Sequence, residues 1–599
     1  MKFAFISGCV CFALVTLAFW SVSAYLEDEL PTIASLEQYE QEIPQLSRVF
    51  AKDGSVLAEF WMERRTLVSA DDVPAHVFDA AVAAEDGNFY THEGLDFFGM
   101  IRALYVNVRD GRFAQGGSTI TQQVVRNFFL SQEKTLRRKL EEVFLARKLE
   151  RHLSKSEILL LYVNQIYFGH GNYGIGEAAR SYLGKRVQDL SLAEAALLMG
   201  QIPSPENYNA RKDPSGAIDR RDRILLRMLE HGFVTQDAYT IAKAEVPRLK
   251  ASHSTVDLRA DYFVDIIRRR LVAALGEERL LKGGLQIHTS LDPELQRKLN
   301  EFVEGKASTL PEKAQVAAVF IDPHTRHVLA LSGGRGFKKH PFNRAFQARR
   351  QVGSLFKPVI FGAGLLSGQF TPESTYLNRL VTYRGSAGPW TPRNWDNVHD
   401  GKPMTIADAL AHSSNVIAVQ ALKDVGIARM EEFARRLGFI SDIPQDLSAA
   451  LGSVEATPLE VTNAYATIAA SGHRGEPVFI TRAQDRHGQV LYSESAQLEL
   501  TVPPLVARAL KLMLRRAVTE GTGRRALIPG AFVAGKTGTT SGNVDAWFVG
   551  FTDELVGTIW VGDDRGRRLP GISGPGTAAP LWHDVVSSVT EASFHDVPQ

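Results

Sequence analysis

The chain has 599 residues, which is too long for one ordinary hydrophobic core, so two or three domains are expected. Apolar residues make up 44% and charged residues 23%, as in ordinary globular proteins, and the formal net charge is only +1. This balance gives no reason to expect nucleic acid or another polyanion as a partner.

The N-terminus carries a membrane signal. Within residues 1–26, the run from Phe3 to Leu26 is nearly all apolar or small, and it lies between Lys2 and the acidic run that starts at Glu27. Because about 20 apolar residues can span a bilayer as a helix, we predict a short cytoplasmic tip and an uncleaved, single-pass signal-anchor. Cleavage after Val22-Ser23-Ala24 is the alternative. The rest of the chain is then expected on the outer, periplasmic side of the cytoplasmic (inner) membrane.

The two cysteines, Cys9 and Cys11, both lie in this apolar segment. No disulfide framework and no thiolate metal site is therefore expected beyond it.

The next two segments differ in pattern. Residues 27–72 read as a polar stalk followed by a small hairpin, with Asp53-Gly54 at its turn. Residues 73–245 repeat apolar side chains at i, i+3 and i+4, which predicts a mainly helical domain. Within it, Ser191 and Glu194 form a capping box that opens a buried helix.

The second half begins with a linker of mixed structure over residues 246–312, followed by a domain over residues 313–590. Two apolar runs, 316–321 and 328–331, predict paired strands, and 546–563 predicts a hairpin near the end. Helical patterns lie between these strands. This order predicts an α+β domain whose terminal strands share one sheet.

Three short motifs follow each other in the second domain: Ser354-Leu-Phe-Lys357, Ser413-Ser414-Asn415 and Lys536-Thr537-Gly538-Thr539. Together they match the S-x-x-K, S-x-N and K-T-G set of acyl-serine enzymes. Ser131-Gln-Glu-Lys134 also fits the first motif, but order and context favour Ser354.

These residue types suit acyl transfer. A serine hydroxyl is a weak nucleophile until a base takes its proton, and a lysine can be that base only if burial or a nearby cation lowers its pKa. We therefore predict Ser354 as nucleophile and Lys357 as base, with Lys536 as the nearby cation. Ser413 and Asn415 are expected to relay protons and to bind the substrate amide.

The helical domain contains four longer motifs, which include two carboxylates, Glu85 and Glu142. They are Glu85-Asp86-Gly-Asn-Phe89-Tyr90-Thr-His92-Glu-Gly94, Gly116-Gly117-Ser118-Thr119-Ile-Thr121-Gln122-Gln123, Arg138-Lys139-Leu-Glu-Glu142 and Lys155-x-x-Ile158-x-x-x-Tyr162-x-Asn164-x-x-Tyr167-Phe168-Gly169. A pair of carboxylates is the usual equipment for acid–base chemistry at a sugar. Glu85 stands beside Phe89 and Tyr90, which favours a raised pKa. Cations beside Glu142 suit the negative charge of a leaving group. The predicted substrate contacts of this domain are Gly117, Ser118, Thr119, Gln122, Arg138, Lys139 and Lys155.

These motifs mark a resemblance. Residues from about Asp79 to Asn209 resemble the peptidoglycan glycosyltransferase domain, whose fold is related to lysozyme, and the second half resembles the transpeptidase domain of penicillin-binding proteins. The chain thus resembles a class A, bifunctional penicillin-binding protein. One departure is Ala210, where the glycosyltransferase family often has proline.

The resemblance implies roles for the predicted residues. Glu85 would activate the 4-hydroxyl of the acceptor lipid II, and Glu142 would lie by the departing pyrophosphate. Ser354 would form an acyl-enzyme with a D-Ala-D-Ala stem peptide and would be acylated by β-lactams. The substrate carboxylate would be held by Lys536, Thr537, Gly538 and Thr539. Nascent glycan strands would pass from the first site to the second.

Other expectations are less specific. The sequence requires no cofactor and contains no metal motif, although the family can show dependence on Mg or Mn near Glu85. Membrane lipid and proteins of cell-wall synthesis are expected partners. Phe97-Phe98, Phe113 and Phe128–Leu130 either enter the bilayer or belong to the core. The alternatives are a lysozyme-like hydrolase, a protein with one active half (a monofunctional glycosyltransferase or a D,D-carboxypeptidase), and a scaffold that binds precursors.

Overall fold

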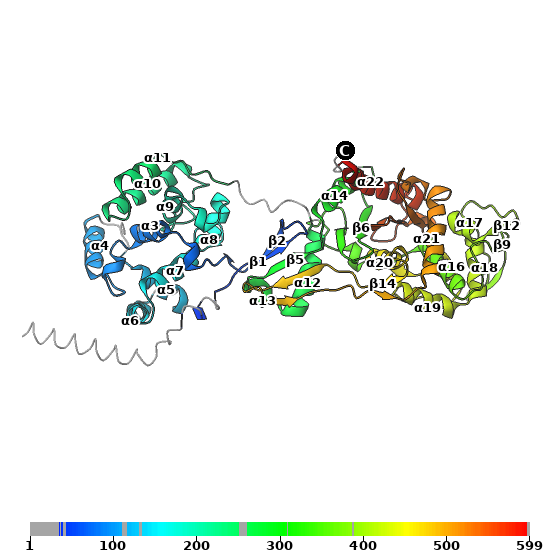
Figure 1. Cartoon of the computed structure of the whole chain (residues 1–599), viewed down its shortest axis with the longest axis horizontal. Helices are drawn as coiled ribbons and strands as arrows, with labels where there is room; N and C mark the ends of the chain where they lie inside the picture. The colour runs from blue at the N-terminus through cyan, green and yellow to red at the C-terminus, as the bar shows by residue number, and fades with distance from the viewer. Residues whose placement is uncertain are drawn as a thin grey trace, which may run out of the picture. The chain divides into compact units, whose positions relative to one another are not determined.

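The chain forms two compact units (Figure 1). The first unit contains Phe60–Ser254 and Glu278–Gly284, and the second contains Arg48–Glu59, Thr255–Glu277 and Leu285–Gln599. The computed structural model describes residues 35, 38–39, 43–110, 117–130, 135–250, 260–307, 309–338, 340–385 and 388–595.

The predicted signal-anchor, residues 1–26, lies outside the described residues. Among the residues that are described, no helix combines the length and the apolar character needed to cross a bilayer.

The first unit is mainly helical, as predicted. Among its described residues, the only paired strands are short: β3 (Arg64–Arg65) runs parallel to β4 (Asn172–Tyr173), with Arg64 opposite Asn172. The helices are α3 (Ala75–Glu85), α4 (Phe97–Asp110), α5 (Ile120–Phe129), α6 (Leu136–His152), α7 (Lys155–Gln165), α8 (Ile175–Ala178), α9 (Leu192–Met199), α10 (Pro214–Glu230), α11 (Gln236–Ala244) and α13 (Glu277–Lys282).

Local sequence signals explain where several of these helices begin. The capping box predicted at Ser191 and Glu194 opens α9, and Thr119 with Gln122 forms a second one at α5. Each box satisfies backbone N–H groups that a helix start leaves without partners. Helix α9 is then buried along its whole length between α3 and α10, so it forms the centre of this core.

The second unit is built on an antiparallel sheet in the order β18-β19-β20-β6-β7. Strands β6 and β7 come from the start of the predicted domain and the other three from its end, so the predicted shared sheet is confirmed, as is the hairpin β19–β20. Its strands are β6 (Gln315–Ile321), β7 (Val328–Ser332), β18 (Ala534–Thr539), β19 (Asp545–Phe551) and β20 (Val556–Gly562).

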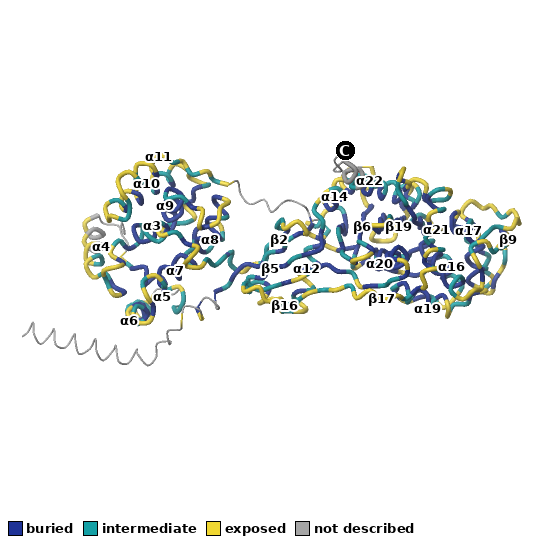
Figure 2. Tube along the Cα trace, viewed as in Figure 1, coloured by how far each residue is buried: buried dark blue, intermediate teal, exposed yellow. Residues whose placement is uncertain are grey.

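Both faces of this sheet are covered. One face packs on α14 (Pro293–Ala307) and α22 (Ala579–His595), and the other on α20 (Pro458–Ala469). Side chains of a strand alternate between faces, so a strand covered on both sides is apolar throughout. Strands β6, β19 and β20 are accordingly buried at every position, as the dark-blue tube of β6 and β19 in Figure 2 illustrates.

A second sheet joins segments that are far apart in the sequence. Its order is β16-β15-β5-β1-β2, with β1 (Ser47–Phe50) parallel to β5 (Gln286–Thr289). The hairpin predicted at Asp53-Gly54 is present as β1 and β2 (Val56–Phe60), and Gly54 has a φ of 84° in its turn. The sequence did not predict the other neighbours, β15 (Ile480–Gln484) and β16 (Val490–Tyr492).

The remaining helices of the second unit surround the motif residues. They are α12 (Asp261–Leu275), α15 (Arg344–Gln347), α16 (Lys357–Leu366), α17 (Ile406–Ala411), α18 (Asn415–Val425), α19 (Ile427–Leu437) and α21 (Pro504–Thr519). Helix α16 packs against α18 and α19, and α21 packs against β18. This packing brings the three motifs of the second unit, which lie at the starts of α16 and α18 and on β18, into one region.

Candidate active sites

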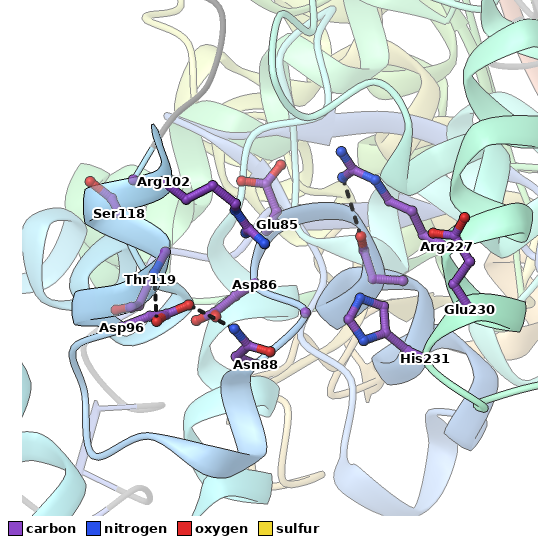
Figure 3. Close-up of a pocket in the computed structure, with 14 residues that line it drawn as sticks. Glu85, Asp86, Asn88, Asp96, Arg102, Ser118, Thr119, Arg227, Glu230 and His231 are labelled. Carbon is purple, nitrogen blue, oxygen red and sulfur yellow. Dashed lines mark hydrogen bonds between the residues drawn. The ribbon is translucent and has the colours of Figure 1, made fainter. Parts of the chain in front are cut away.

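Glu85 is the last residue of α3 and lies at a pocket of about 340 Å³ in the first unit (Figure 3). In that view Glu85 stands between the guanidinium groups of Arg102 and Arg227. The lining includes Ala83, Glu85, Asp86, Gly87, Asn88, Asp96, Gly99, Arg102, Gly117, Ser118, Thr119, Arg227, Glu230 and His231. The pocket therefore combines carboxylates, cations and hydroxyl donors around one reactive carboxyl group.

The neighbours of the Glu85 carboxyl fix its position and shift its pKa. Desolvation by the surrounding protein raises its pKa, while a hydrogen bond from Gln123 Nε2 to Glu85 Oε2, 2.9 Å long, acts in the opposite direction. The charge of Arg227 also opposes the rise. The predicted rise in pKa is thus present, but neither Phe89 nor Tyr90 is among the described residues that line the pocket.

Asp86 ties the glycine-containing loop to Glu85. Its Oδ2 accepts a hydrogen bond of 3.0 Å from the backbone N–H of Ile120, the first residue of α5, and also contacts His92 Nε2 at 3.1 Å. Thr119 Oγ1 donates to the Gly94 carbonyl at 2.7 Å. These contacts place Gly117, Ser118 and Thr119 at the pocket, close to Glu85.

Glu142 is connected to the pocket through Lys139. Its side chain is fully buried on α6 and pairs with Lys139 Nζ, which also donates to Ser118 Oγ at 3.3 Å. Glu142 is not among the described residues that line the pocket, so the structure connects it to the site through Lys139 and Ser118. Arg138 follows the N-cap residue Thr135 on the same helix.

Two predicted substrate contacts, Gln122 and Lys155, have hydrogen-bond partners within the protein. Gln122 is buried, and its Oε1 accepts a hydrogen bond of 3.0 Å from the Thr119 backbone N–H in the capping box. Lys155 Nζ donates to the His92 carbonyl at 2.7 Å and to Glu150 at 2.8 Å. Gln123, which is not among the predicted site residues, is the glutamine that contacts Glu85.

Arg227 was also missed, since nothing in its local sequence distinguishes it from other helix-surface arginines. Its guanidinium donates to the Ala84 carbonyl at 3.1 Å, at the C-terminal end of α3. A cation is favourable there because backbone carbonyls at a helix end lack partners. Arg227 therefore supports the backbone that carries Glu85.

The aromatic residues were predicted either to enter the bilayer or to belong to the core, and their exposure differs from one segment to the next. On α4, Phe97, Phe98 and Ile101 are 65%, 86% and 67% exposed. Phe128 and Phe129 are partly buried and pack against the core of the first unit, and Phe113 lies outside the described residues.

No group of three or more His, Cys, Asp or Glu side chains suited to a metal ion occurs in the described part of the chain. At the pocket, Glu85 is bound by Gln123, and Asp86 by His92 and a backbone N–H. This donor set does not fit a metal site made by protein ligands alone.

In the second unit, Ser354 lies in a single helical turn, Gly353–Phe356, directly before α16. Lys357 follows one turn later, as the motif spacing predicts. The turn is held from outside: Val352 N–H donates to the Val454 carbonyl at 2.9 Å, and Gly353 N–H donates to the Gly452 carbonyl at 3.0 Å. The Ser354 turn is thus fixed by a segment about 100 residues further along the chain.

Of the residues that hold the Ser354 turn, Gly452 lies too close to Gly353 to carry a side chain. Its φ is 72°, and a Cβ atom at this position would lie 1.8 Å from the Gly353 carbonyl oxygen. Gly452→Ala is expected to displace the Ser354 turn, and a displacement of about 1 Å costs on the order of 100-fold in rate. Acylation kinetics with fluorescent penicillin measure the effect.

The matched control is Gly488→Ala. Gly488 has a φ of 82° but nothing within 4 Å of a Cβ position, so it carries the backbone strain alone, about 1–2 kcal/mol. A Gly452→Ala protein that is acylated as fast as the Gly488→Ala protein would show that this contact does not position Ser354.

Lys357, Ser413, Asn415 and Lys536 meet in one buried network. Lys357 Nζ donates to Ser413 Oγ at 3.2 Å and to Asn415 Oδ1 at 2.7 Å. Lys536 Nζ donates to the same Ser413 Oγ at 2.9 Å. Ser413 has a φ of 59°, a conformation that few residues other than glycine adopt, so its hydroxyl is placed between the two amines at the expense of backbone strain.

Both amines are fully buried, and this changes their acidity. Burial lowers the pKa of Lys357 well below its ordinary value, and the charge of Lys536 lowers it further. Burial also lowers the pKa of Lys536 to about 7. A neutral Lys357 can accept a proton, which is the property required of the base. The Ser354 hydroxyl makes no hydrogen bond to Lys357 within the described structure, and such bonds often tighten only when substrate is bound.

A pH profile tests this coupling. If Lys536 lowers the pKa of Lys357, Lys536→Met should raise it, so that Lys357 becomes protonated at higher pH. The acid limb of kcat/KM for acylation is then expected to move to higher pH, in addition to a loss of rate. Lys536→Arg, which keeps the charge, should leave the limb near its original position. An acid limb that stays in place in the Met variant would assign that titration to another group.

Strand β18 carries the K-T-G motif along the same site. Thr537 Oγ1 lies 2.6 Å from Thr522 Oγ1, and Thr539 Oγ1 accepts a hydrogen bond of 3.0 Å from the Gly574 backbone N–H. A Cβ atom at Gly538 would lie 2.8 Å from the Val352 carbonyl oxygen, so glycine lets β18 approach the segment before Ser354. Thr522 is a further residue that the sequence analysis did not single out.

The two units therefore define an enzyme with two sites, one built around a desolvated carboxyl group and one around a serine with two buried lysines. Comparison with known families agrees: a transglycosylase model matches residues 53–229, and a penicillin-binding protein transpeptidase domain model matches residues 316–561. The chain belongs to the class A, bifunctional penicillin-binding proteins. It is a peptidoglycan glycosyltransferase and a serine-type transpeptidase, and a target of β-lactams.

Individual relatives cover most of the chain. It is 35% identical over 633 residues to penicillin-binding protein 1A of Aquifex aeolicus, across 91% of this chain and 86% of that protein. The crystal structure of penicillin-binding protein 1A from Haemophilus influenzae has a TM-score of 0.62 at 21% identity, covering 93% of both chains, which bears on the fold alone. The PonA1 protein of Mycobacterium tuberculosis in complex with penicillin V has a TM-score of 0.50 at 25% identity, covering 57% of this chain and 94% of that one.

Proposed function

We propose that Glu85 is the general base of glycan polymerisation. It removes the proton of the acceptor 4-hydroxyl, whose oxygen then bonds to the anomeric carbon of the donor as the bond to the lipid diphosphate breaks. The supporting observation is a desolvated carboxyl with a raised pKa, held by Gln123 at the pocket wall. A base with a pKa nearer to the working pH transfers protons more efficiently.

The reaction also requires that the negative charge on the departing diphosphate be stabilised, and we assign this role to Lys139. Its ammonium group stands beside the Ser118 hydroxyl, which lines the Glu85 pocket. Glu142, which pairs with Lys139, lies by the departing diphosphate in this proposal. Arg138 adds positive charge on the same helix, and charge of this sign stabilises the developing oxyanion.

The lipid part of the substrate is assigned to α4. Gly99 and Arg102 of this helix line the pocket together with Asp96, the residue before it, while Phe97, Phe98 and Ile101 are exposed. Exposed apolar side chains of this size are typical of surfaces that enter a membrane interface. Together with the apolar segment 1–26, they support an enzyme anchored in the cytoplasmic membrane with both sites on its outer side.

At the second site, Ser354 Oγ attacks the carbonyl carbon of the penultimate D-alanine as Lys357 takes the hydroxyl proton. The C–N bond to the last residue breaks, D-alanine leaves with a proton, and the acyl group stays on Ser354. An amine of a neighbouring stem peptide then bonds to the acyl carbon, and the Ser354 oxygen is released. Ser413 lies between both lysines and relays protons, while Lys536, Thr537 and Thr539 hold the substrate carboxylate.

Polymerisation of purified lipid II by the detergent-solubilised protein tests both proposals, with products digested by muramidase and the muropeptides resolved. Polymer with penicillin-sensitive cross-links is the expected result. Uncross-linked polymer would mean that water replaces the amine acceptor, as in a D,D-carboxypeptidase. The absence of polymer from protein that still binds penicillin would overturn the proposed role of the Glu85 site.

A further inference from the structure

The loop between β11 (Gly388–Trp390) and β12 (Pro403–Thr405) contains a buried asparagine directed at the S-x-N motif. The Oδ1 atom of Asn394 accepts hydrogen bonds from Ser414 Oγ at 3.2 Å, from Asn415 N–H at 2.8 Å and from Val416 N–H at 3.2 Å. These donors form the start of α18. One carboxamide oxygen thus binds the whole N-terminal turn that presents Asn415.

The opposite side of Asn394 fixes its orientation. Its Nδ2 donates to Asn378 Oδ1 and to the Val398 carbonyl, both at 2.9 Å, and its backbone N–H donates to His399 Nε2 at 3.0 Å. A carboxamide rotated by 180° would direct N–H groups at the donors of α18 and leave them unsatisfied. The oxygen therefore faces α18.

The preceding residue of the loop holds Asn415 directly. Asn415 Nδ2 donates to the Arg393 carbonyl at 2.8 Å, while Asn415 Oδ1 accepts from Lys357 Nζ at 2.7 Å. Both ends of the Asn415 side chain, and its backbone N–H, are thereby determined by this loop and by the base. A movement of the loop would be transmitted through Asn415 to the Lys357 amine.

We propose that Asn394 is a positioning residue for acyl transfer: it fixes Asn415, and through Asn415 it directs the Lys357 amine. Within the described structure it makes no hydrogen bond to Ser354 or to any other residue of the S-x-x-K motif, so its effect on the reaction passes through Asn415. The inference rests on Ser354 and Lys357 acting as nucleophile and base.

A purely structural role is the competing explanation, because Asn394 also satisfies the first N–H groups of a helix. Loss of such a contact costs about 1 kcal/mol of stability wherever the helix lies. Thr457→Ala provides the comparison: Thr457 caps α20 through its Oγ1, which accepts from Glu460 N–H at 3.2 Å, and it belongs to neither catalytic motif.

The experiment is a double-mutant cycle in the full-length, detergent-solubilised protein, with Asn394→Ala, Asn415→Ala and both together. The second-order rate constant of acylation by fluorescent penicillin and the thermal melting point are measured for each. Asn394→Ala is expected to slow acylation by about 10- to 100-fold. Since its effect passes through Asn415, the double variant should be no slower than Asn415→Ala alone.

Two further variants complete the design. Thr457→Ala should lower the melting point by a similar amount, be acylated at the wild-type rate, and combine multiplicatively with Asn415→Ala. Asn394→Asp keeps the acceptor oxygen and should be acylated within a few-fold of wild type; it carries the test if Asn394→Ala does not fold. Wild-type acylation of Asn394→Ala, multiplicative effects within the cycle, or an Asn394→Asp protein that melts normally but is acylated slowly would each overturn the proposal.

Discussion

Ser354→Ala is expected to abolish covalent labelling by fluorescent penicillin and all cross-linking, while glycan polymerisation continues. No other atom can replace the serine oxygen as the attacking group, and removal of a nucleophile from an acyl-transfer site typically costs on the order of 10⁶-fold in rate. Polymerisation is retained because Glu85 and its pocket belong to the other compact unit. Gel labelling and muropeptide analysis of the same preparation measure both effects.

The matched control is Ser131→Ala, which alters the second S-x-x-K sequence of the chain. Residues 131–134 lie outside the described structure, so this control rests on the sequence alone. Labelling that survives in the Ser354→Ala protein and disappears in the Ser131→Ala protein would transfer the nucleophile to the first half of the chain.

Glu85→Gln should have the converse effect: polymerisation of lipid II falls by about 10²- to 10⁴-fold, the usual contribution of a general base, and penicillin labelling is unchanged. The amide is close in shape to the carboxyl but cannot accept the acceptor hydroxyl's proton. In the wild type, Gln123 Nε2 donates to a carboxylate oxygen of Glu85. The substituted amide keeps this hydrogen bond only if its oxygen faces Gln123.

Glu93→Gln is the control, because Glu93 is an exposed carboxylate in the same stretch of sequence. It should polymerise lipid II at the wild-type rate. Substantial polymerisation by the Glu85→Gln protein would remove Glu85 from the role of base and would direct attention to the other carboxylates at the pocket, Asp86, Asp96 and Glu230.

Several features of the protein depend on neighbouring residues alone, and these were predictable. The S-x-x-K spacing places Lys357 one turn after Ser354, and the structure has this turn directly before α16. The capping box at Ser191 opens α9, and the apolar runs of β6 and β7 pair as expected. In each case the signal is a local spacing that reports helical or extended periodicity.

Contacts between distant segments had no such signal. Gln122 and Gln123 are adjacent and chemically identical, yet one closes a capping box and the other binds Glu85. Which of the two faces Glu85 depends on the rotation of α5 against α3, which the sequence of α5 alone does not specify. Glu142 is predicted at the first site because it is acidic and lies near cations. The structure adds that it is buried and paired with Lys139, whose ammonium group also contacts Ser118 at the pocket.

The sequence by itself determined the family, the two activities, the helical and α+β character of the two domains, and Ser354 with Lys357 as a pair. The tertiary structure decided what holds these groups in place: Gly452 against the Ser354 turn, Asn394 against α18, and Arg227 against the end of α3. The physical reason is that each supporting contact joins segments separated by about 20 to 140 residues. Such pairings are selected by how the whole core packs, and no spacing within either segment reports them.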